Sequence, residues 1–259
     1  MKILCLGDVV GLPAVDDLLT RLPALKKELG ADLVVVNGEN ASMGKGNGMT
    51  PEDASDLFAA GADVITGGNH TMRQRNLYTL LDESISVLRP ANLPASNPGK
   101  GSTVAHLGKK DVLVVNLMGR VGMEPVASCP FEAFDRIVAE ERRHYDFIVV
   151  DFHAEATSEK IALGYYCASR AAVFFGTHTH VQTADEQILS GRCGYITDIG
   201  MCGPSSSCLG LKTELIVEKF RSGMPCRFEP AENPCRISGA LFTVDDRTNV
   251  CTAVDRISV

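Results

Sequence analysis

Long apolar segments are missing from this sequence. No uninterrupted apolar run in its 259 residues approaches the length of about 20 residues that a membrane-spanning helix needs. The first apolar run, at residues 3–6, is too short for the apolar region of a secretion signal. We therefore expect a cytoplasmic protein without a membrane partner.

A basic excess and closely spaced cysteine pairs are missing as well. The formal net charge is −7 and the pI is near 5.4, whereas binders of long nucleic acid commonly present a broad basic surface. Long nucleic acid is therefore not the expected partner. The nine cysteines include no CxxC pair, which predicts unpaired core or loop cysteines in a reducing compartment and argues against a cysteine-based zinc site.

The composition that is present, 45% apolar and 22% charged residues, is ordinary for a soluble globular protein. The β-branched runs predict strands covered on both faces, at residues 32–37, 147–151 and 172–175. Apolar spacing and N-terminal signals predict helices at residues 14–29, 51–61, 71–82, 131–144, 157–170 and 213–221. Pro23 either kinks the first of these helices or begins a second one.

The C-terminal part is richer in short β-like runs, at residues 187–189, 194–197, 226–230, 236–244 and 250–258. No linker, repeat or low-complexity tract separates it from the rest. We therefore predict one α/β domain over residues 1–259, built from a mixed sheet or a two-sheet sandwich with helices outside.

Polar side chains follow the predicted strands at five separate junctions: Asp8, Glu39 with Asn40, Asn69 with His70, His153, and His178 with His180. Ligands of open α/β sheets bind at the carboxyl ends of the strands. Each residue taken alone is more often a turn, a cap or an ordinary histidine, but five equivalent positions favour a metal site. Imidazole and carboxylate without thiolate suit two ions such as Mn²⁺, Fe or Zn²⁺ better than Mg²⁺ alone or a structural zinc.

His178 and His180 are separated by one residue after a short apolar run that ends in Gly176. In an extended segment, side chains two positions apart lie on the same side. The two imidazoles could therefore bind one ion together or one ion each.

The order of these motifs resembles that of the calcineurin-like metallophosphoesterases, which carry D-x-H, G-D, G-N-H, H and G-H-x-H. The sequence departs from this pattern twice: Val10 replaces the D-x-H histidine, and Glu39 replaces the bridging aspartate. In both departures it resembles the YmdB-like subfamily of bacterial cyclic-nucleotide phosphodiesterases. Longer strings resemble the same subfamily, at residues 37–41, 89–92, 151–160, 176–185 and 196–201. Met72 and Arg73 depart from it, so the substrate-facing side of that segment could differ.

The resemblance implies a four-layer α/β/β/α fold of mixed sheets sandwiched by helices. It also implies two metal sites that share Glu39 as a bridge, the first formed with Asp8, Asn40 and His180, and the second with Asn69, His153 and His178. Iron and manganese are the expected ions, with zinc as an alternative. The implied substrates are small phosphodiesters, namely 2′,3′- or 3′,5′-cyclic nucleotides.

Two cations about 3.5–4 Å apart can share a hydroxide and clamp phosphoryl oxygens during in-line displacement. The leaving oxygen then needs a proton, and His70, beside the expected ligand Asn69, is the candidate donor because a histidine pKa lies near working pH. Alternatively, His70 only orients the hydroxide or the phosphate. Glu155 and Lys160 are expected to be surface residues near a helix start, although Glu155 could fix the tautomer of a metal-bound histidine.

Two rival functions remain open at this point. One is a phosphomonoesterase or 5′-nucleotidase with the same metal chemistry. The other is a regulatory protein whose metal site serves to bind a nucleotide or RNA, against which the acidic pI argues mildly. Homo-oligomer formation is a further possibility that the sequence does not decide.

Overall fold

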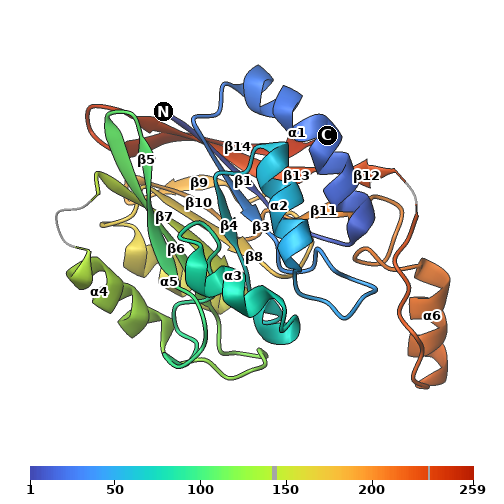
Figure 1. Cartoon of the computed structure of the whole chain (residues 1–259). Coiled ribbons are helices and arrows are strands. Elements are labelled where there is room, and N and C mark those ends of the chain that lie inside the picture. Colours follow the sequence, from blue (N-terminus) through green and yellow to red (C-terminus); the bar gives the residue numbers. More distant parts are fainter. Residues whose placement is uncertain (142–144, 233) are drawn as a thin grey trace.

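Two large β-sheets pack face to face in the computed structural model, which describes residues 1–141, 145–232 and 234–259 (Figure 1). The five-stranded sheet has the order β14-β13-β1-β3-β4. Its strands are β14 (Val250–Ser258), β13 (Ser238–Asp245), β1 (Lys2–Leu6), β3 (Leu33–Asn37) and β4 (Val64–Thr66). The parallel pairs β1–β3 and β3–β4 place the carboxyl ends of these strands at one edge of the sheet.

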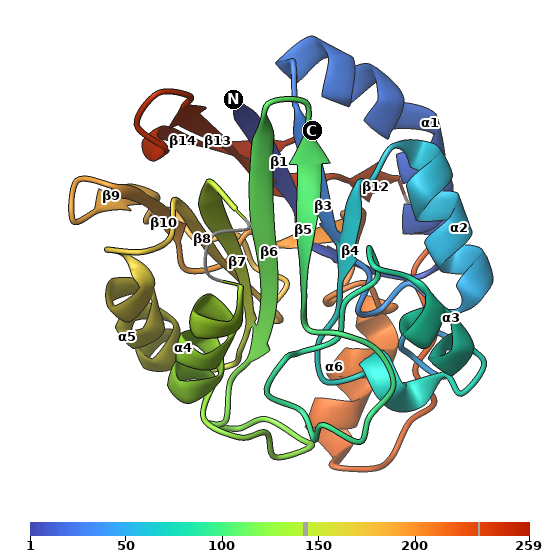
Figure 2. The ribbon, with the colours of Figure 1, turned by 60° about the vertical axis from the view of Figure 1, so that its left-hand side comes forward.

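The second large sheet has six strands in the order β5-β6-β7-β8-β10-β9. They are β5 (Ser102–Leu107), β6 (Lys110–Met118), β7 (Phe147–His153), β8 (Val173–Thr177), β10 (Cys193–Ile196) and β9 (Gln187–Leu189). A small three-stranded sheet joins β12 (Cys235–Arg236), β11 (Met201–Pro204) and β2 (Asp8–Val9). Figure 2 shows β5, β6 and β7 side by side, with the C-terminal ends of β6 and β7 toward the same edge.

The alternation of side chains along each strand explains this layering. Ile3 and Cys5 of β1 pack in the apolar cluster that also contains Val112 and Val114 of β6, so this cluster fills the space between the two sheets. Side chains on the opposite faces of these strands join two other clusters, which contain the helices. The central strands β3, β7 and β8 are therefore buried on both faces, as the β-branched runs predicted, whereas the edge strands β14, β5 and β9 are partly exposed.

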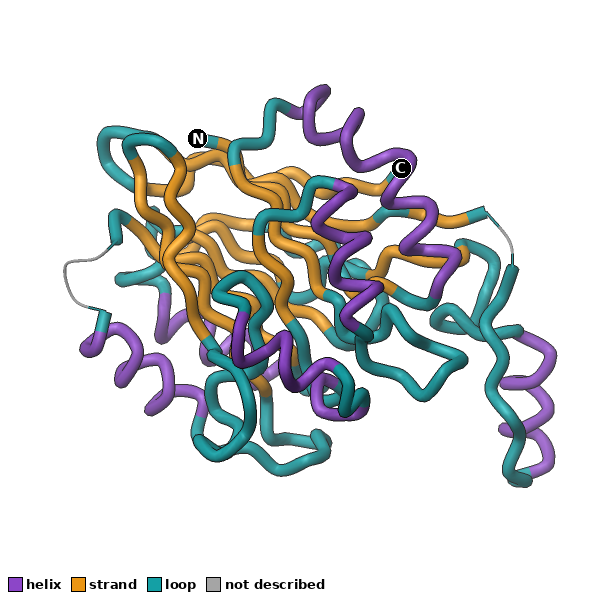
Figure 3. The backbone as a smooth tube through the Cα atoms, in the orientation of Figure 1, coloured by secondary structure: helices purple, strands orange, loops and turns teal. Residues whose placement is uncertain are grey.

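The helices cover the two outer faces. Helices α1 (Leu12–Leu29), α2 (Pro51–Ala60) and α3 (Leu77–Glu83) pack on the five-stranded sheet, and α4 (Pro130–Glu140) and α5 (Thr157–Cys167) pack on the six-stranded sheet. Figure 3 shows strands in the centre with helices on both sides. The predicted four-layer α/β/β/α fold is therefore confirmed. That the chain forms one domain stays a prediction.

Several predicted elements differ in detail. Helix α1 runs unbroken through Pro23. The helix predicted at residues 71–82 is instead a 3₁₀ turn, η1 (Thr71–Arg73), followed by α3, because Gln74 adopts an extended backbone between them. The predicted end of α4 at residue 144 lies outside the described residues.

The C-terminal region also differs. Residues 226–230 belong to none of the strands in the described ranges; Pro230 forms only an isolated bridge with Leu211. They return from α6 (Thr213–Ser222), which protrudes from the rest of the molecule (Figure 1). No helix in the part of the chain that the structure describes is long and apolar enough to cross a membrane.

Candidate metal centre

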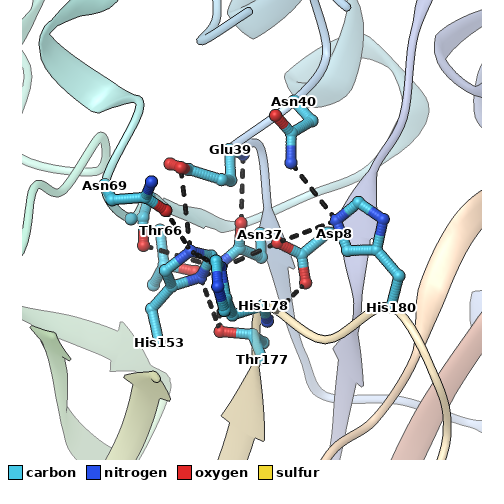
Figure 4. A network of polar contacts seen from close by, with 12 residues as sticks. Asp8, Asn37, Glu39, Asn40, Thr66, Asn69, His153, Thr177, His178 and His180 are labelled. Atoms are coloured by element: carbon cyan, nitrogen blue, oxygen red, sulfur yellow. Dashed lines mark hydrogen bonds and ion pairs between the residues drawn. The ribbon is translucent and has the colours of Figure 1, made fainter. Parts of the chain in front are cut away.

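The polar residues predicted at strand ends converge in one place, although they come from all parts of the chain. Figure 4 shows the side chains clustered together. They come from the start of β2, which follows β1, and from the carboxyl ends of β3, β4, β7 and β8 or the residues just beyond them. The cluster contains Asp8, Glu39, Asn40, Asn69, His153, His178 and His180. Parallel pairing brings carboxyl ends together at one edge within each large sheet, and the side-chain contacts show that these edges of the two packed sheets adjoin.

Asp8, Asn40 and His180 form one group of contacts. Asp8 is fully buried on β2, and its Oδ1 lies 3.8 Å from His180 Nε2. The same imidazole nitrogen lies 3.3 Å from Asn40 Nδ2. The group thus offers a carboxylate, an amide and an imidazole from three distant segments of the sequence.

Asn69, His153 and His178 form a second group. His153 ends β7 and is fully buried, and its Nε2 lies 3.1 Å from Asn69 Oδ1 and 3.1 Å from His178 Nδ1. Asp8 also contacts this group, since its Oδ2 accepts a hydrogen bond from the His178 backbone N–H at 3.0 Å. The two groups are therefore direct neighbours.

Glu39 is placed between Asn69 and Asn40 (Figure 4). Its Oε1 accepts a hydrogen bond from the His70 backbone N–H at 2.5 Å and lies 3.7 Å from His153 Nε2. Its other oxygen, Oε2, is buried, as is Asp8 Oδ1, and neither has a hydrogen-bond partner among the described residues. A buried carboxylate oxygen without a donor is costly, so both oxygens favour a cationic partner.

Burial changes the protonation of the cluster in a consistent way. It raises the pKa of Asp8 to about 7, with a further contribution from the charge of Asp198, and it raises the pKa of Glu39 well above its usual value. Burial also lowers the pKa of His153 and His180, which keeps these imidazoles neutral. Neutral imidazole is the form that binds a metal ion, and a cation would stabilise the ionised carboxylates.

The donor set therefore fits transition-metal ions by its chemistry and by its partnerless carboxylate oxygens. Within the described ranges, however, no three His, Cys, Asp or Glu side chains are already arranged as the ligands of one ion. His153 and His178 instead contact each other directly at 3.1 Å. Binding of an ion between them requires that contact to open.

His70 lies beside the cluster. Its Nδ1 is 2.8 Å from Asn40 Oδ1 and 3.3 Å from Glu39 Oε1. Burial, with smaller contributions from the positive charges of Arg73 and neighbouring histidines, lowers the pKa of His70 to about 4. The imidazole is therefore neutral at pH 7, so a role as proton donor requires a bound anionic phosphate to favour its protonated form.

Asp151 and Thr177 were not singled out in the sequence, yet they orient His153. Thr177 Oγ1 donates to Asp151 Oδ1 at 2.8 Å and lies 3.0 Å from His153 Nδ1. Because the hydroxyl hydrogen goes to Asp151, Thr177 Oγ1 accepts from Nδ1–H, which leaves the Nε2 lone pair facing the cluster.

Asp151 is fully buried and is held by two further donors. Its Oδ2 accepts from Asn37 Nδ2 at 2.9 Å and from Thr66 Oγ1 at 2.5 Å. One signal in the sequence could have identified it, namely a charged residue inside an apolar strand, two positions before His153 and hence on the same side.

The prediction that Lys160 is a surface residue is wrong. Lys160 is 1% exposed, and its Nζ donates to Asp198 Oδ2 at 2.7 Å. The same Asp198 oxygen accepts from Thr179 N at 3.1 Å and from Thr179 Oγ1 at 2.8 Å. This buried ion pair therefore supports Thr179, which lies between His178 and His180. The backbone φ angles are 99° at His178 and 65° at His180.

Glu155 lies where it can orient His178, as one of the two hypotheses for it required. Its Oε2 is 3.1 Å from His178 Nε2, while Nδ1 of that imidazole faces His153. A carboxylate on the outer nitrogen fixes the ring orientation of a metal-binding histidine.

A cavity of about 330 Å³ adjoins the cluster. Asn69 forms part of its wall together with Met72, Arg73, Leu93, Glu124 and Pro125. The two residues that depart from the subfamily pattern, Met72 and Arg73, therefore line a space beside an expected metal ligand.

Gly68 allows His153 to occupy its position. A Cβ atom at residue 68 would lie 2.3 Å from the His153 ring atoms Cδ2 and Nε2, well inside van der Waals contact. We expect Gly68→Ala to displace the imidazole and to lower metal content and turnover together, by roughly 10-fold to 100-fold, the range seen when a metal ligand loses its support.

Metal analysis and turnover measured on the same preparation test this expectation. Gly108→Ala is the control: its added Cβ meets nothing within 4 Å, and its positive φ of 66° costs about 1 kcal/mol of stability, so metal content and turnover of the folded protein should be unchanged. Full metal content in a folded Gly68→Ala protein would contradict the argument.

Comparisons with known proteins agree with one another. Residues 4–257 match the model of a family described as YmdB-like protein. The 2′,3′-cyclic-nucleotide 2′-phosphodiesterase of Bacillus subtilis (strain 168) is 42% identical over 259 residues, which cover 100% of this chain and 97% of that protein.

Two solved structures are similar over the whole chain. A hypothetical protein from Thermus thermophilus has a TM-score of 0.92 and 36% identity, with 100% of this chain and 99% of that chain covered. A structure described as a novel phosphatase, from Mycoplasma pneumoniae, has a TM-score of 0.93 and 34% identity, with 100% and 93% covered.

Proposed function

Because the chain belongs to the YmdB-like protein family, we propose that it is a metal-dependent phosphodiesterase that hydrolyses small cyclic phosphodiesters. The observation that carries this proposal is the pair of buried, partnerless carboxylate oxygens on Asp8 and Glu39, surrounded by neutral imidazoles. Among substrates we favour 2′,3′-cyclic nucleotides over 3′,5′-cyclic nucleotides, following the activity named for the Bacillus subtilis relative.

We assign the ligands to two ions. Asp8, Asn40 and His180 would hold one ion, Asn69, His153 and His178 would hold the other, and Glu39 would contribute to both. The assignment follows the two groups of side-chain contacts and the central place of Glu39. Bound iron, manganese or zinc would supply Lewis acidity toward the phosphoryl oxygens and an activated water.

The chain's own residues orient this chemistry. Asp151 and Thr177 keep the His153 Nε2 lone pair directed at the cluster, and Glu155 holds the outer nitrogen of His178. His70 is the residue we assign to protonate the leaving oxygen, because it lies next to Asn69 and contacts Asn40. An anionic phosphate beside His70 favours the protonated imidazole that this step needs.

We assign the cavity lined by Met72 and Arg73 to the part of the substrate other than its phosphate group. It adjoins Asn69, and the charge of Arg73 attracts an anionic substrate to a molecule whose net charge is −7.

Substitution of His70 tests its assigned role. We expect His70→Ala to retain both metal ions and to lower kcat by about 10²-fold to 10⁴-fold, the usual contribution of general acid catalysis. His106→Ala is the matched control, since His106 is exposed on β5. An empty metal site, or an unchanged kcat, would rule the role out.

A turnover screen tests the function itself. The metal-reconstituted protein is assayed with 2′,3′- and 3′,5′-cyclic nucleotides and with nucleoside monophosphates, beside Glu39→Gln. We expect turnover of 2′,3′-cyclic nucleotides with release of the 3′-monophosphate, and none by Glu39→Gln. Metal-independent turnover, or turnover of monoesters alone, would overturn the proposal.

A phosphomonoesterase or 5′-nucleotidase is the second candidate, because a similar solved structure is described as a phosphatase. Parallel assays on bis-p-nitrophenyl phosphate and p-nitrophenyl phosphate separate the two. We place the protein in the cytoplasm as part of the proposal, in keeping with nine free cysteines, all within the described ranges.

A further inference from the structure

A second cavity, of about 790 Å³, lies against the face of α4. The segment 89–102, residues 126 and 128, and residues 136–141 of α4 and its end supply its walls. Its volume is in the range of sites that bind small organic molecules, about 300–1,000 Å³. None of the seven residues assigned to the metal ions lines it.

Arg89 in the wall of this cavity is buried without a counterion. It is 7% exposed, and its guanidinium Nη1 donates to the carbonyl oxygen of Pro90 at 2.8 Å. Its Nε is buried without a partner, and none of the ion pairs among the described residues includes Arg89. An arginine keeps its charge in proteins, so this buried cation has no anionic partner among the residues that the structure describes.

Further positive charge faces the same cavity. Arg136 and Lys100 line it, and the charge of Arg136, after burial, lowers the pKa of Arg89. Arg136 is only loosely paired with Glu140, at 3.5 Å, and both of these side chains are more than half exposed. Because Arg89 pairs with none of the carboxylates in the described residues, an oxyanion in the cavity could bind its guanidinium directly.

The rest of the lining indicates what the oxyanion belongs to. Ala91, Leu93 and Ile137 give an aliphatic wall, and Glu140 and Glu141 lie about one turn beyond Arg136 along α4. Carboxylates accept hydrogen bonds from hydroxyl groups. An inorganic phosphate would contact the arginines but would leave most of the volume unfilled.

We propose that this cavity binds a small phosphorylated sugar, with Arg89 contacting the phosphate and Glu140 or Glu141 accepting from sugar hydroxyls. Nucleotides and free sugar phosphates share this chemistry. The cavity is a neighbour of the metal centre, because Leu93 lines both it and the cavity beside Asn69. Asn92 in its wall donates to Met118 O at 2.7 Å, and Met118 pairs with His153.

Calorimetric titration of the metal-loaded full chain tests the proposal with ribose 5-phosphate, inorganic phosphate and ribose as probes. We expect ribose 5-phosphate to bind more tightly than phosphate, and ribose not to bind. In Arg89→Met the affinity for ribose 5-phosphate should fall by about 10-fold or more, the scale of a lost charged hydrogen bond. Arg89→Lys keeps the positive charge but loses the two-pronged guanidinium. Its affinity for ribose 5-phosphate should lie between those of the unmodified protein and Arg89→Met.

Melting temperature separates binding from a structural role. Without ligand, Arg89→Met should melt no lower than the unmodified protein, because the substitution removes an unpaired buried charge. It should lose the rise in melting temperature that ribose 5-phosphate causes. Arg247→Met, an exposed arginine on the β13–β14 turn, is the control and should retain both binding and the rise.

Two outcomes would overturn the proposal. One is ribose 5-phosphate affinity in Arg89→Met or Arg89→Lys equal to that of the unmodified protein. The other is ribose 5-phosphate that still binds the variants with unchanged affinity and still inhibits their diester hydrolysis competitively. That result would place the ligand at the metal centre. A nucleoside 3′,5′-bisphosphate is a further probe. If it binds more tightly than ribose 5-phosphate, the ligand is a nucleotide; if it does not, the ligand is a free sugar phosphate.

Discussion

Glu39→Gln is expected to lose metal at both positions and to lower turnover by at least about 10³-fold, a loss of several kcal/mol of transition-state stabilisation. Glutamine has the same size as glutamate and can still accept the hydrogen bond from the His70 backbone N–H that Oε1 accepts now. It removes only the negative charge that would bind two cations. The predicted effect therefore isolates charge from shape.

The stability of Glu39→Gln is the second half of this prediction. Burial holds the pKa of Glu39 well above its usual value, so an ionised Glu39 is costly unless a cation compensates it. We expect the variant to melt no lower than the metal-depleted unmodified protein. Metal content by elemental analysis, turnover and melting temperature are measured together.

The control for Glu39→Gln is Glu218→Gln, the same substitution at an exposed position on α6. It should keep metal content and turnover. Retention of both ions by a folded Glu39→Gln would contradict the bridging position, and near-normal turnover with bound metal would contradict the proposed chemistry.

Lys160→Met is expected to lower the free energy of unfolding by about 3–5 kcal/mol, the usual cost of breaking a buried ion pair on one side. Asp198 is buried 2.7 Å from Lys160 and would be left without its cationic partner. The loss corresponds to a fall in melting temperature of about 10 °C for a chain of this size. Urea unfolding of the metal-loaded protein measures it.

The same substitution should reduce metal affinity, because Asp198 holds Thr179 between His178 and His180. The double variant Lys160→Met with Asp198→Asn removes both charges and should be less destabilised than the sum of the two single variants. Lys109→Met, on the exposed β5–β6 turn, is the control and should be close to neutral. Additive effects in the double variant would show that the two side chains act independently.

Much of the candidate site could be predicted from individual residues. Asp8 and Glu39 follow apolar strands and His153 ends one, and within each large sheet a residue at the carboxyl end of a parallel strand lies at the same edge wherever that strand sits. This rule needs no knowledge of strand order. The site was therefore predictable as a set of residues while the pairwise contacts within it were not.

Other features could not be predicted because they depend on partners distant in sequence. Lys160 looks like a solvated residue near a helix start, and only the placement of α5 against the end of β10 gives it Asp198, 38 residues away. Asp151 likewise receives its donors from β3, β4 and β8. The effect of a buried charge on stability depends on its neighbours, since the same side chain is destabilising alone and tolerated when it is paired.

The sequence by itself determined which segments form strands with side chains on alternating faces, and which polar residues stand at the strand ends. Both follow from the two-residue period of a β-strand. The tertiary structure alone decided the rest. It placed Thr177 between Asp151 and His153. Among the described residues it also left carboxylate oxygens of Asp8 and Glu39 without donors and buried Arg89 beside a cavity without an anionic partner. The reason is that desolvation and charge pairing act through space, between segments whose distance along the chain carries no information about their contact.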